Sequence, residues 1–200
     1  MIRLLVGICV LLGPFFANSQ SFQPGHFTTM DSKEVKAYIK FNPIQSGHMT
    51  ASGSVPGRVK IKTETDSQPF ELSTEEIKGF VAGLDSFVIM KNIPVSETEH
   101  FKRDFVKVEV TGRFNLFVHL SQIQSGRFGT KIKKVYILNR KGTKKLTSFH
   151  NRYQKDQFIQ LIADDPELVE KVQNDWQWMD HLPEVIKKYN SRFIEVNAKK

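Results

Sequence analysis

The only cysteine of the chain, Cys9, lies inside an apolar segment at its start, so the rest of the protein must fold without a disulfide. Residues 4–16 are apolar apart from glycine and proline, and they follow a single cation, Arg3. Ala17 and Ser19 then supply small residues at the two positions that a signal peptidase reads. An apolar run of 13 residues is too short to cross a bilayer, which takes roughly 20 helical residues. We therefore expect residues 1–19 to be a cleaved signal peptide.

Cleavage would place the protein in the periplasm or outside the cell, with no membrane span and no lipid anchor. Removal of the first 19 of the 200 residues leaves 181 residues, none of them cysteine. A chain of this length can bury roughly 70% of its unfolded surface, so a packed core can stabilise it without disulfides. The lack of cysteine and of Asn-x-Ser/Thr sequons favours a bacterial exported protein over a eukaryotic secreted domain.

Alternation of apolar and polar residues predicts strands in the first part of the body. Residues 20–34 show no period before Val35, and we expect an N-terminal arm there that is loose or becomes ordered on contact. Residues 35–41 and 58–63 alternate regularly and predict two strands, and Phe70 with Leu72 indicates a short third one. Residues 45–57 are rich in Ser and Gly and predict a long exposed loop.

The middle of the chain has the composition of antiparallel hairpins. A capping-box pattern at residues 73–76 predicts a brief helix, and residues 80–90 are expected to be extended with a bend at Gly83. Two hairpins rich in β-branched and aromatic residues follow, one joined through Gly112-Arg113. The expected strands of these hairpins are residues 105–111, 114–120, 132–138 and 146–149. The body would thus contain about eight strands.

The pattern becomes helical near residue 152. Asp165 followed by Pro166 is typical of a helix start, with Asp as the N-cap. Pro183 marks another start, and Leu182, Val185, Ile186, Tyr189 and Phe193 then share one helical face. Strands followed by helices predict an α+β fold, with a mainly antiparallel sheet or open barrel and two or three C-terminal helices. The expected division is a β-rich domain at residues 35–150 and a helical segment at residues 151–200 packed on it.

Three stretches of the chain together carry a resemblance. They are the signal ending near residue 20, the central segments 76–80 (Glu-Ile-Lys-Gly-Phe) and 105–112, and the tail from Phe158 through residues 164–168 to Tyr189-Asn190. With them the sequence resembles a broad group of uncharacterised exported proteins of Bacteroidota. The resemblance implies a β-rich body with a helical tail, and no known activity or site residues. It departs at residues 45–57, where the group has a glycine-punctuated hairpin.

No motif in the sequence predicts catalysis, a metal site or a cofactor. Ser54 stands in a Gly/Ser loop without a nucleophile elbow, and Asp164 with Asp165 fits helix capping better than a pair of catalytic carboxylates. The histidines are too far apart for metal-ligand spacing, and His119 is expected to face solvent or to be held by a hydrogen bond. The six are His26, His48, His100, His119, His150 and His181. We expect the protein not to be an enzyme.

Two tryptophans leave an alternative open. Trp176 and Trp178 flank Gln177 near a helix break. Exposed, they could stack on sugar rings or on a partner protein. Buried, they would fix the helical tail to the sheet, which we favour because aromatic side chains contribute large buried areas.

The strongest functional signal is the distribution of charge. Loss of Arg3 with the leader takes the net charge from +8 to +7, and residues 110–155 hold eleven cations and no carboxylate. Residues 156–185 are acidic by contrast, with eight carboxylates and one lysine. A basic hairpin at residues 127–145 could bind an anionic ligand through Lys131, Lys133, Arg140, Lys141, Lys144 and Lys145. The competing interpretation is a solvated edge hairpin whose lysines prevent edge-to-edge association.

The chain as a whole therefore predicts a non-catalytic exported protein, envelope-associated, that binds or supports another component. The alternative is an anionic-ligand-binding module that uses the basic hairpin. An anionic envelope component or another envelope protein would be the partner. Nucleic acid is not expected, because export separates the chain from it and no nucleic-acid-binding motif is present.

Overall fold

The computed structural model describes most of the chain beyond the predicted leader. The described residues are 21–44, 48–50, 53–55, 57–66, 68–94, 100–125 and 129–198. The predicted signal peptide, including Cys9, lies outside them. Within them, none of the helices is both long enough and apolar enough to span a membrane.

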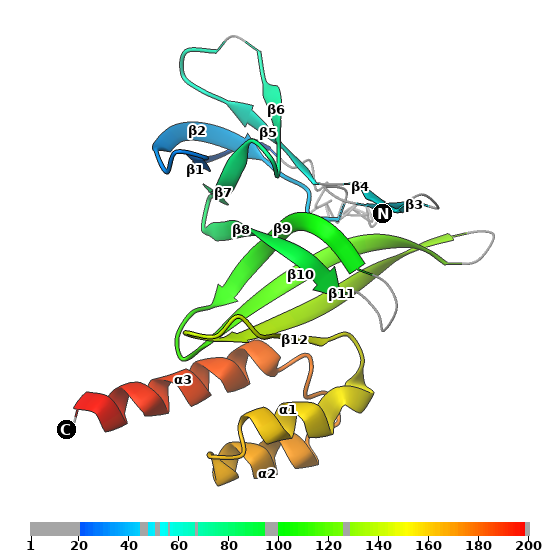
Figure 1. Ribbon diagram of the computed structural model, residues 1–200, viewed down its shortest axis with the longest axis vertical. Helices are drawn as coiled ribbons and strands as arrows, with labels where there is room; N and C mark the ends of the chain where they lie inside the picture. The colour runs from blue at the N-terminus through cyan, green and yellow to red at the C-terminus, as the bar shows by residue number, and fades with distance from the viewer. Residues whose placement is uncertain are drawn as a thin grey trace, which may run out of the picture.

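The protein is one large antiparallel sheet followed by helices (Figure 1), which confirms the predicted α+β class. The strands are β1 (Gln23–Thr29), β2 (Glu34–Lys40), β3 (His48–Thr50), β4 (Gly53–Val55), β5 (Arg58–Lys62), β6 (Phe70–Ser73), β7 (Ile77–Ala82), β8 (Asp85–Pro94), β9 (His100–Val110), β10 (Phe114–Ser125), β11 (Gly129–Arg140) and β12 (Leu146–Phe149). The helical elements are η1 (Arg152–Gln154), α1 (Lys155–Leu161), α2 (Pro166–Asn174) and α3 (Leu182–Ala198).

Ten strands form one continuous path in the order β12-β11-β10-β9-β8-β7-β1-β2-β5-β6. The sheet is open, with β12 and β6 at its edges, and β3 and β4 attach outside this path. From β7 to β12 each strand pairs with its neighbour in sequence, as the predicted hairpins require. Near the start, β5 pairs with β2 rather than with β4, so the segment between them leaves the main path.

The predicted N-terminal arm is wrong, because β1 is an interior strand between β2 and β7. Its sequence hides this role, since Pro24 and Gly25 interrupt the alternation. At Gly25 the neighbouring strand passes so close that a Cβ atom would lie 1.8 Å from the Val81 carbonyl oxygen. Glycine is thus needed because the two backbones approach so closely. A residue without a side chain adds nothing to the alternation of apolar and polar residues from which a strand is predicted.

Two further predictions on this side of the sheet need correction. The long Ser/Gly loop contains a short hairpin, β3–β4, and β3 also makes one parallel pairing with β10. The capping-box residues Ser73 and Glu76 do exchange hydrogen bonds, with the Glu76 carboxylate accepting from the Ser73 N–H and hydroxyl at 2.8 Å. They close a turn between β6 and β7 instead of starting a helix, since strand pairing resumes at Ile77.

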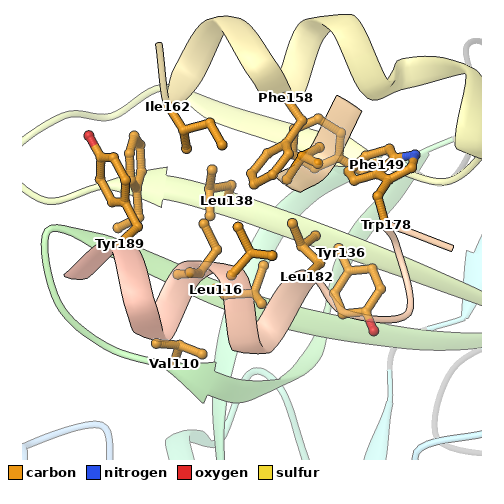
Figure 2. Packing of buried hydrophobic residues seen from close by; sticks show 14 of the residues in the cluster. Val110, Leu116, Tyr136, Leu138, Phe149, Phe158, Ile162, Trp178, Leu182 and Tyr189 are labelled. Carbon is orange, nitrogen blue, oxygen red and sulfur yellow. The ribbon is translucent and has the colours of Figure 1, made fainter. Parts of the chain in front are cut away.

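The C-terminal helices cover one face of β9–β12 and form the largest apolar core (Figure 2). In it, Trp178 stacks on Phe158 at 5.3 Å and meets Phe149 edge-on at 5.7 Å. The predicted face of the last helix is buried from Leu182 to Tyr189. Trp178 is 1% exposed and anchors the tail, whereas Trp176 is 68% exposed, so the two tryptophans have different environments.

Two smaller cores complete the packing. One lies between β1, β2, β5 and the strands from β7 to β9, around an aromatic group of Phe41, Phe80, Phe87 and Phe105. The other lies on the face of β10 and β11 opposite the helices, where Val135 and Ile137 meet residues of β8 and β9 such as Phe101. Residues 114–118 of β10 and 135–138 of β11 are therefore covered on both faces.

One side chain of α3 fastens the β9–β10 turn to the helices. Asn190, which is 5% exposed, accepts a hydrogen bond from the Phe114 N–H at 2.9 Å and donates to the Phe114 carbonyl at 2.8 Å. Its amide also donates to the Thr111 carbonyl at 3.4 Å. A Cβ at Gly112 would lie 2.4 Å from the Asn190 Nδ2, so the small turn residue makes room for this contact.

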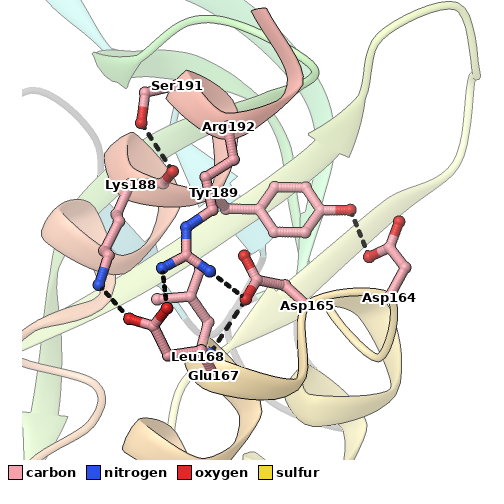
Figure 3. Close-up of polar contacts among 8 residues, drawn as sticks. All are labelled: Asp164, Asp165, Glu167, Leu168, Lys188, Tyr189, Ser191 and Arg192. Atoms are coloured by element: carbon pink, nitrogen blue, oxygen red, sulfur yellow. Dashed lines mark hydrogen bonds and ion pairs between the residues drawn. The ribbon is translucent and has the colours of Figure 1, made fainter. Parts of the chain in front are cut away.

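The acidic residues at the start of α2 are used within the tail (Figure 3). Asp165 caps the helix as predicted, accepting from the Leu168 N–H at 3.1 Å, and Arg192 of α3 bridges Asp165 and Glu167. Burial raises the pKa of Asp164, but hydrogen bonds from Tyr189 and Arg113 outweigh it and hold that pKa below its usual value. These carboxylates bind the helices to one another and to the sheet.

Candidate functional site

The β11–β12 connection, residues 140–145, carries four of the six predicted anion-binding cations; we call it the basic loop. Gly142 has φ = +84°, the left-handed conformation that glycine adopts without strain. Thr143 donates to the Arg140 carbonyl from its N–H at 3.0 Å and from its hydroxyl at 2.9 Å. The turn is therefore closed by local hydrogen bonds at its centre.

Asn139, the residue before the loop, fixes the remaining backbone. Its side-chain amide donates to the Thr143 and Lys145 carbonyls, each at 3.0 Å. On the other side, the Lys141 N–H donates to the Arg113 carbonyl at 2.8 Å, next to the β9–β10 turn. The loop is thus held at three points, and its cations project from an ordered backbone.

These cations have no neutralising partner within the described part of the chain. Arg140, Lys141, Lys144 and Lys145 are all exposed, and none forms an ion pair with a described carboxylate. The acidic tail is instead paired with other cations, namely Arg113, Arg152, Lys188 and Arg192. The tail therefore leaves the positive charge of the loop uncompensated.

A pocket of about 290 Å³ opens between the basic loop and α1. Arg140 and Lys145 supply its charge, and an apolar floor lies beneath them. The other lining residues are the hydrogen-bonding Thr143, Thr147 and Gln160 and the apolar Phe114, Leu138 and Leu161. Two cations, neutral polar groups and an apolar floor suit a ligand with an anionic head and a short apolar part.

The six predicted cations do not form one cluster. Strand β11 is 12 residues long, with Lys133 opposite Ser121 and Arg140 opposite Phe114. Lys133 and Arg140 are seven positions apart, which corresponds to about 23 Å of extended chain. Lys131 lies one alternation further away in β11, and its side chain is outside the described residues. Sequence reasoning also missed Gln160 and Leu161, because nothing local indicates that α1 lies against the loop.

A second hollow, of about 400 Å³, lies where β2, β8 and β10 approach one another. Its walls include Phe41, Phe87 and Leu120, and Lys107 is the one cation among the described residues that line it. Lys107 is paired with Asp85 at 2.9 Å and Glu109 at 3.5 Å. The hydrogen bond to Asp85 raises the pKa of Lys107, so this charge is already committed within the protein. The hollow offers apolar surface but no free cation.

His119 is held by a hydrogen bond, one of its two predicted environments. Its Nε2 lies 2.9 Å from Oδ2 of Asp104, and both side chains are 0% exposed. Oδ1 of Asp104 accepts from the Phe105 N–H at 2.8 Å, and the Phe101 ring packs edge-on against the imidazole. Nδ1 of His119 and the hydroxyl of Ser121 have no hydrogen-bond partner among the described residues. A reactant has no access to this pair in the closed core.

Within the same described ranges, no three His, Asp or Glu side chains gather as a metal site would require. Comparisons with family models, with curated proteins and with solved structures found no match to this chain. The site is thus defined by its own geometry alone.

Proposed function

We propose that the protein is a non-catalytic exported protein that binds an anionic amphiphile at the basic loop. The observation that carries this proposal is the ordered group of four unpaired cations, two of which line a pocket with an apolar floor. A phosphate or carboxylate head would lie between Arg140 and Lys145, and an alkyl portion would cover Leu138 and Leu161. The leader-like N-terminus supports action outside the cytoplasm, where anionic envelope lipids are the matching ligand class.

The His119–Asp104 pair supports a non-catalytic role. It resembles the base and orienting acid of a hydrolase, but its complete burial leaves no path for a substrate. Buried in this way, the pair joins β9 to β10 beyond the point where their ladder ends at Lys107 and Val118.

Binding of octyl phosphate and of inorganic phosphate, measured by isothermal titration calorimetry, tests the proposal. We expect octyl phosphate to bind at least tenfold more tightly, because each buried methylene contributes about 0.8 kcal/mol. R140E/K145E should abolish binding of both ligands. K171E/K187E, which makes the same change of charge at exposed lysines of α2 and α3, serves as the matched control and should leave binding intact.

The pattern of results separates the possible ligand sources. Equal affinity for octyl phosphate and inorganic phosphate would mean that the basic loop binds a free anion, and it would contradict the proposed lipid-like ligand. Octyl phosphate binding that survives R140E/K145E would overturn the site. Binding should also weaken with added salt, because exposed charges are screened beyond about 10 Å at 0.1 M salt.

A further inference from the structure

A second basic surface lies on the outer side of β2 and β5, far from the basic loop in the fold (Figure 1). The inward residues of these strands, such as Ile39 and Ile61, are fully buried. The outward positions, which alternate with them, are exposed and mostly cationic. We call them the basic face: Lys36, Lys40, Arg58, Lys60 and Lys62.

The strand register brings cations of this face together. Lys40 lies directly opposite Lys60 in the β2–β5 pair, and Lys62 lies opposite Tyr38. Like charges directly opposite each other destabilise an antiparallel pair, whose Cβ atoms are about 5 Å apart. An anionic ligand bound over Lys40 and Lys60 would offset the repulsion between them, which gives this pairing a physical reason.

The protein neutralises this face only in part. Its outward positions contain two carboxylates, Glu34 and Glu71, against five cations, which leaves +3. Glu71 is shared by Arg58 at 3.8 Å and Lys60 at 3.6 Å. The other three lysines form no ion pair with any carboxylate that the structure describes. They are Lys36, Lys40 and Lys62.

Aromatic side chains accompany the cations. Tyr38 lies between Lys36 and Lys40 on this face and is 45% exposed, whereas Phe70 lies opposite Ile61 in the register and so on the other face of the sheet. A groove of about 390 Å³ is lined by the facing lysines Lys40 and Lys60, by Glu71, and by Phe22, Pro69 and Phe70. Aromatic rings provide flat apolar surfaces on which the apolar face of a sugar can stack, while ammonium groups pair with acid groups on the same chain.

We propose that the basic face binds an acidic polysaccharide. Carboxylates of successive sugars would pair with the cations of β5, which recur about every 7 Å, and with Lys36 and Lys40, which are about 13 Å apart along β2. Tyr38, which lies opposite Lys62 on this face, would contact the sugar rings. The apolar contacts distinguish this ligand from a simple anion, and the extended row of cations distinguishes it from the small ligand proposed for the basic loop.

The test is binding of the purified protein to polygalacturonate, with dextran as the neutral polysaccharide and anionic phospholipid vesicles as the membrane alternative. We expect binding to polygalacturonate and not to dextran, and any binding to the vesicles, which the basic loop can provide, should be unchanged in K40E/K60E. K40E/K60E should weaken polygalacturonate binding at least tenfold, whereas K171E/K187E, an equal charge reversal at exposed lysines of α2 and α3, should change it less than twofold. Thermal melting of each variant shows whether the sheet remains folded.

Two more variants keep the test decisive if K40E/K60E unfolds. K36Q/K62Q removes two unpaired cations without adding acid and should weaken binding three- to tenfold. Y38A should weaken binding by a factor that persists at 0.5 M salt, where charge pairs are screened. Unchanged affinity in K36Q/K62Q, or binding to vesicles in place of polygalacturonate, would overturn the proposal.

Discussion

The contact between Asn190 and the β9–β10 turn makes a quantitative prediction about how the helical tail is held. Asn190→Ala removes the side-chain amide that accepts a hydrogen bond from the Phe114 N–H at 2.9 Å and donates one to the Phe114 carbonyl at 2.8 Å. Each buried polar group left unpaired costs about 1–3 kcal/mol. Thr111 beside it is exposed, so water can replace part of the loss. We therefore expect the free energy of unfolding to fall by about 3 kcal/mol.

Urea denaturation measures this change. With an m-value of about 2–3 kcal/mol/M, the midpoint should fall by about 1–1.5 M while m stays constant. A double-mutant cycle then separates the contact from a general effect of truncation. Gly112→Ala would place its Cβ 2.4 Å from Nδ2 of Asn190, so it should cost about 1–3 kcal/mol in the native background. In the Asn190→Ala background the obstructing amide is gone, and the same change should cost much less.

Strict additivity of the two substitutions would refute this reasoning. It would mean that Gly112 and Asn190 stabilise the fold independently. A midpoint shift below about 0.3 M for Asn190→Ala would likewise show that the helix is not fastened through this side chain.

Three further predictions concern the tail and the basic loop. The hydrogen bond with Asp175 raises the pKa of His181, so its stabilising effect should be complete below about pH 6.5 and lost as pH rises through the higher folded-state value. The unfolding free energies of the native protein and His181→Gln should therefore differ more at pH 5.5 than at pH 8.5, and a larger difference at pH 8.5 would contradict the assignment. Trp178→Ala should cost about 3–5 kcal/mol in urea denaturation, while Trp176→Ala should stay within about 0.5 kcal/mol. Gly142→Ala should cost about 1–2 kcal/mol because a side chain is strained at φ = +84°, and calorimetry should show weaker octyl phosphate binding as the loop loses its geometry.

The parts of the fold that could be predicted are those encoded by neighbouring residues. The β9–β10 hairpin is marked by β-branched and aromatic residues around Gly112, and the start of α2 is marked by Asp165 before Pro166. The interior strand β1 was missed because its neighbour β7 is distant in sequence. The need for Gly25 arises only when the Val81 carbonyl is beside it.

The same reasoning applies to the candidate sites. The run of cations around the basic loop was visible in the sequence, but the 12-residue length of β11, which separates Lys133 from Arg140, was not. The facing of Lys40 and Lys60 depends on β5 skipping β3 and β4 to pair with β2. Likewise, the bond between His119 and Asp104 joins two strands across a break in their ladder. Each of these contacts depends on the register between paired strands. The pattern of neighbouring residues in the sequence does not contain that register.

The position of β1 has a consequence for the order in which the protein can assemble. Phe27 pairs with Phe80, so about fifty further residues must emerge after β1 before its second neighbour exists. Until then β1 can pair only with β2, and its other edge stays open to other chains even after β5 and β6 have joined β2. Strands β7 to β12, in contrast, each find a partner as soon as the next one is made. Aggregation during biosynthesis should therefore begin from the first two strands, and a factor that shields nascent chain would act there.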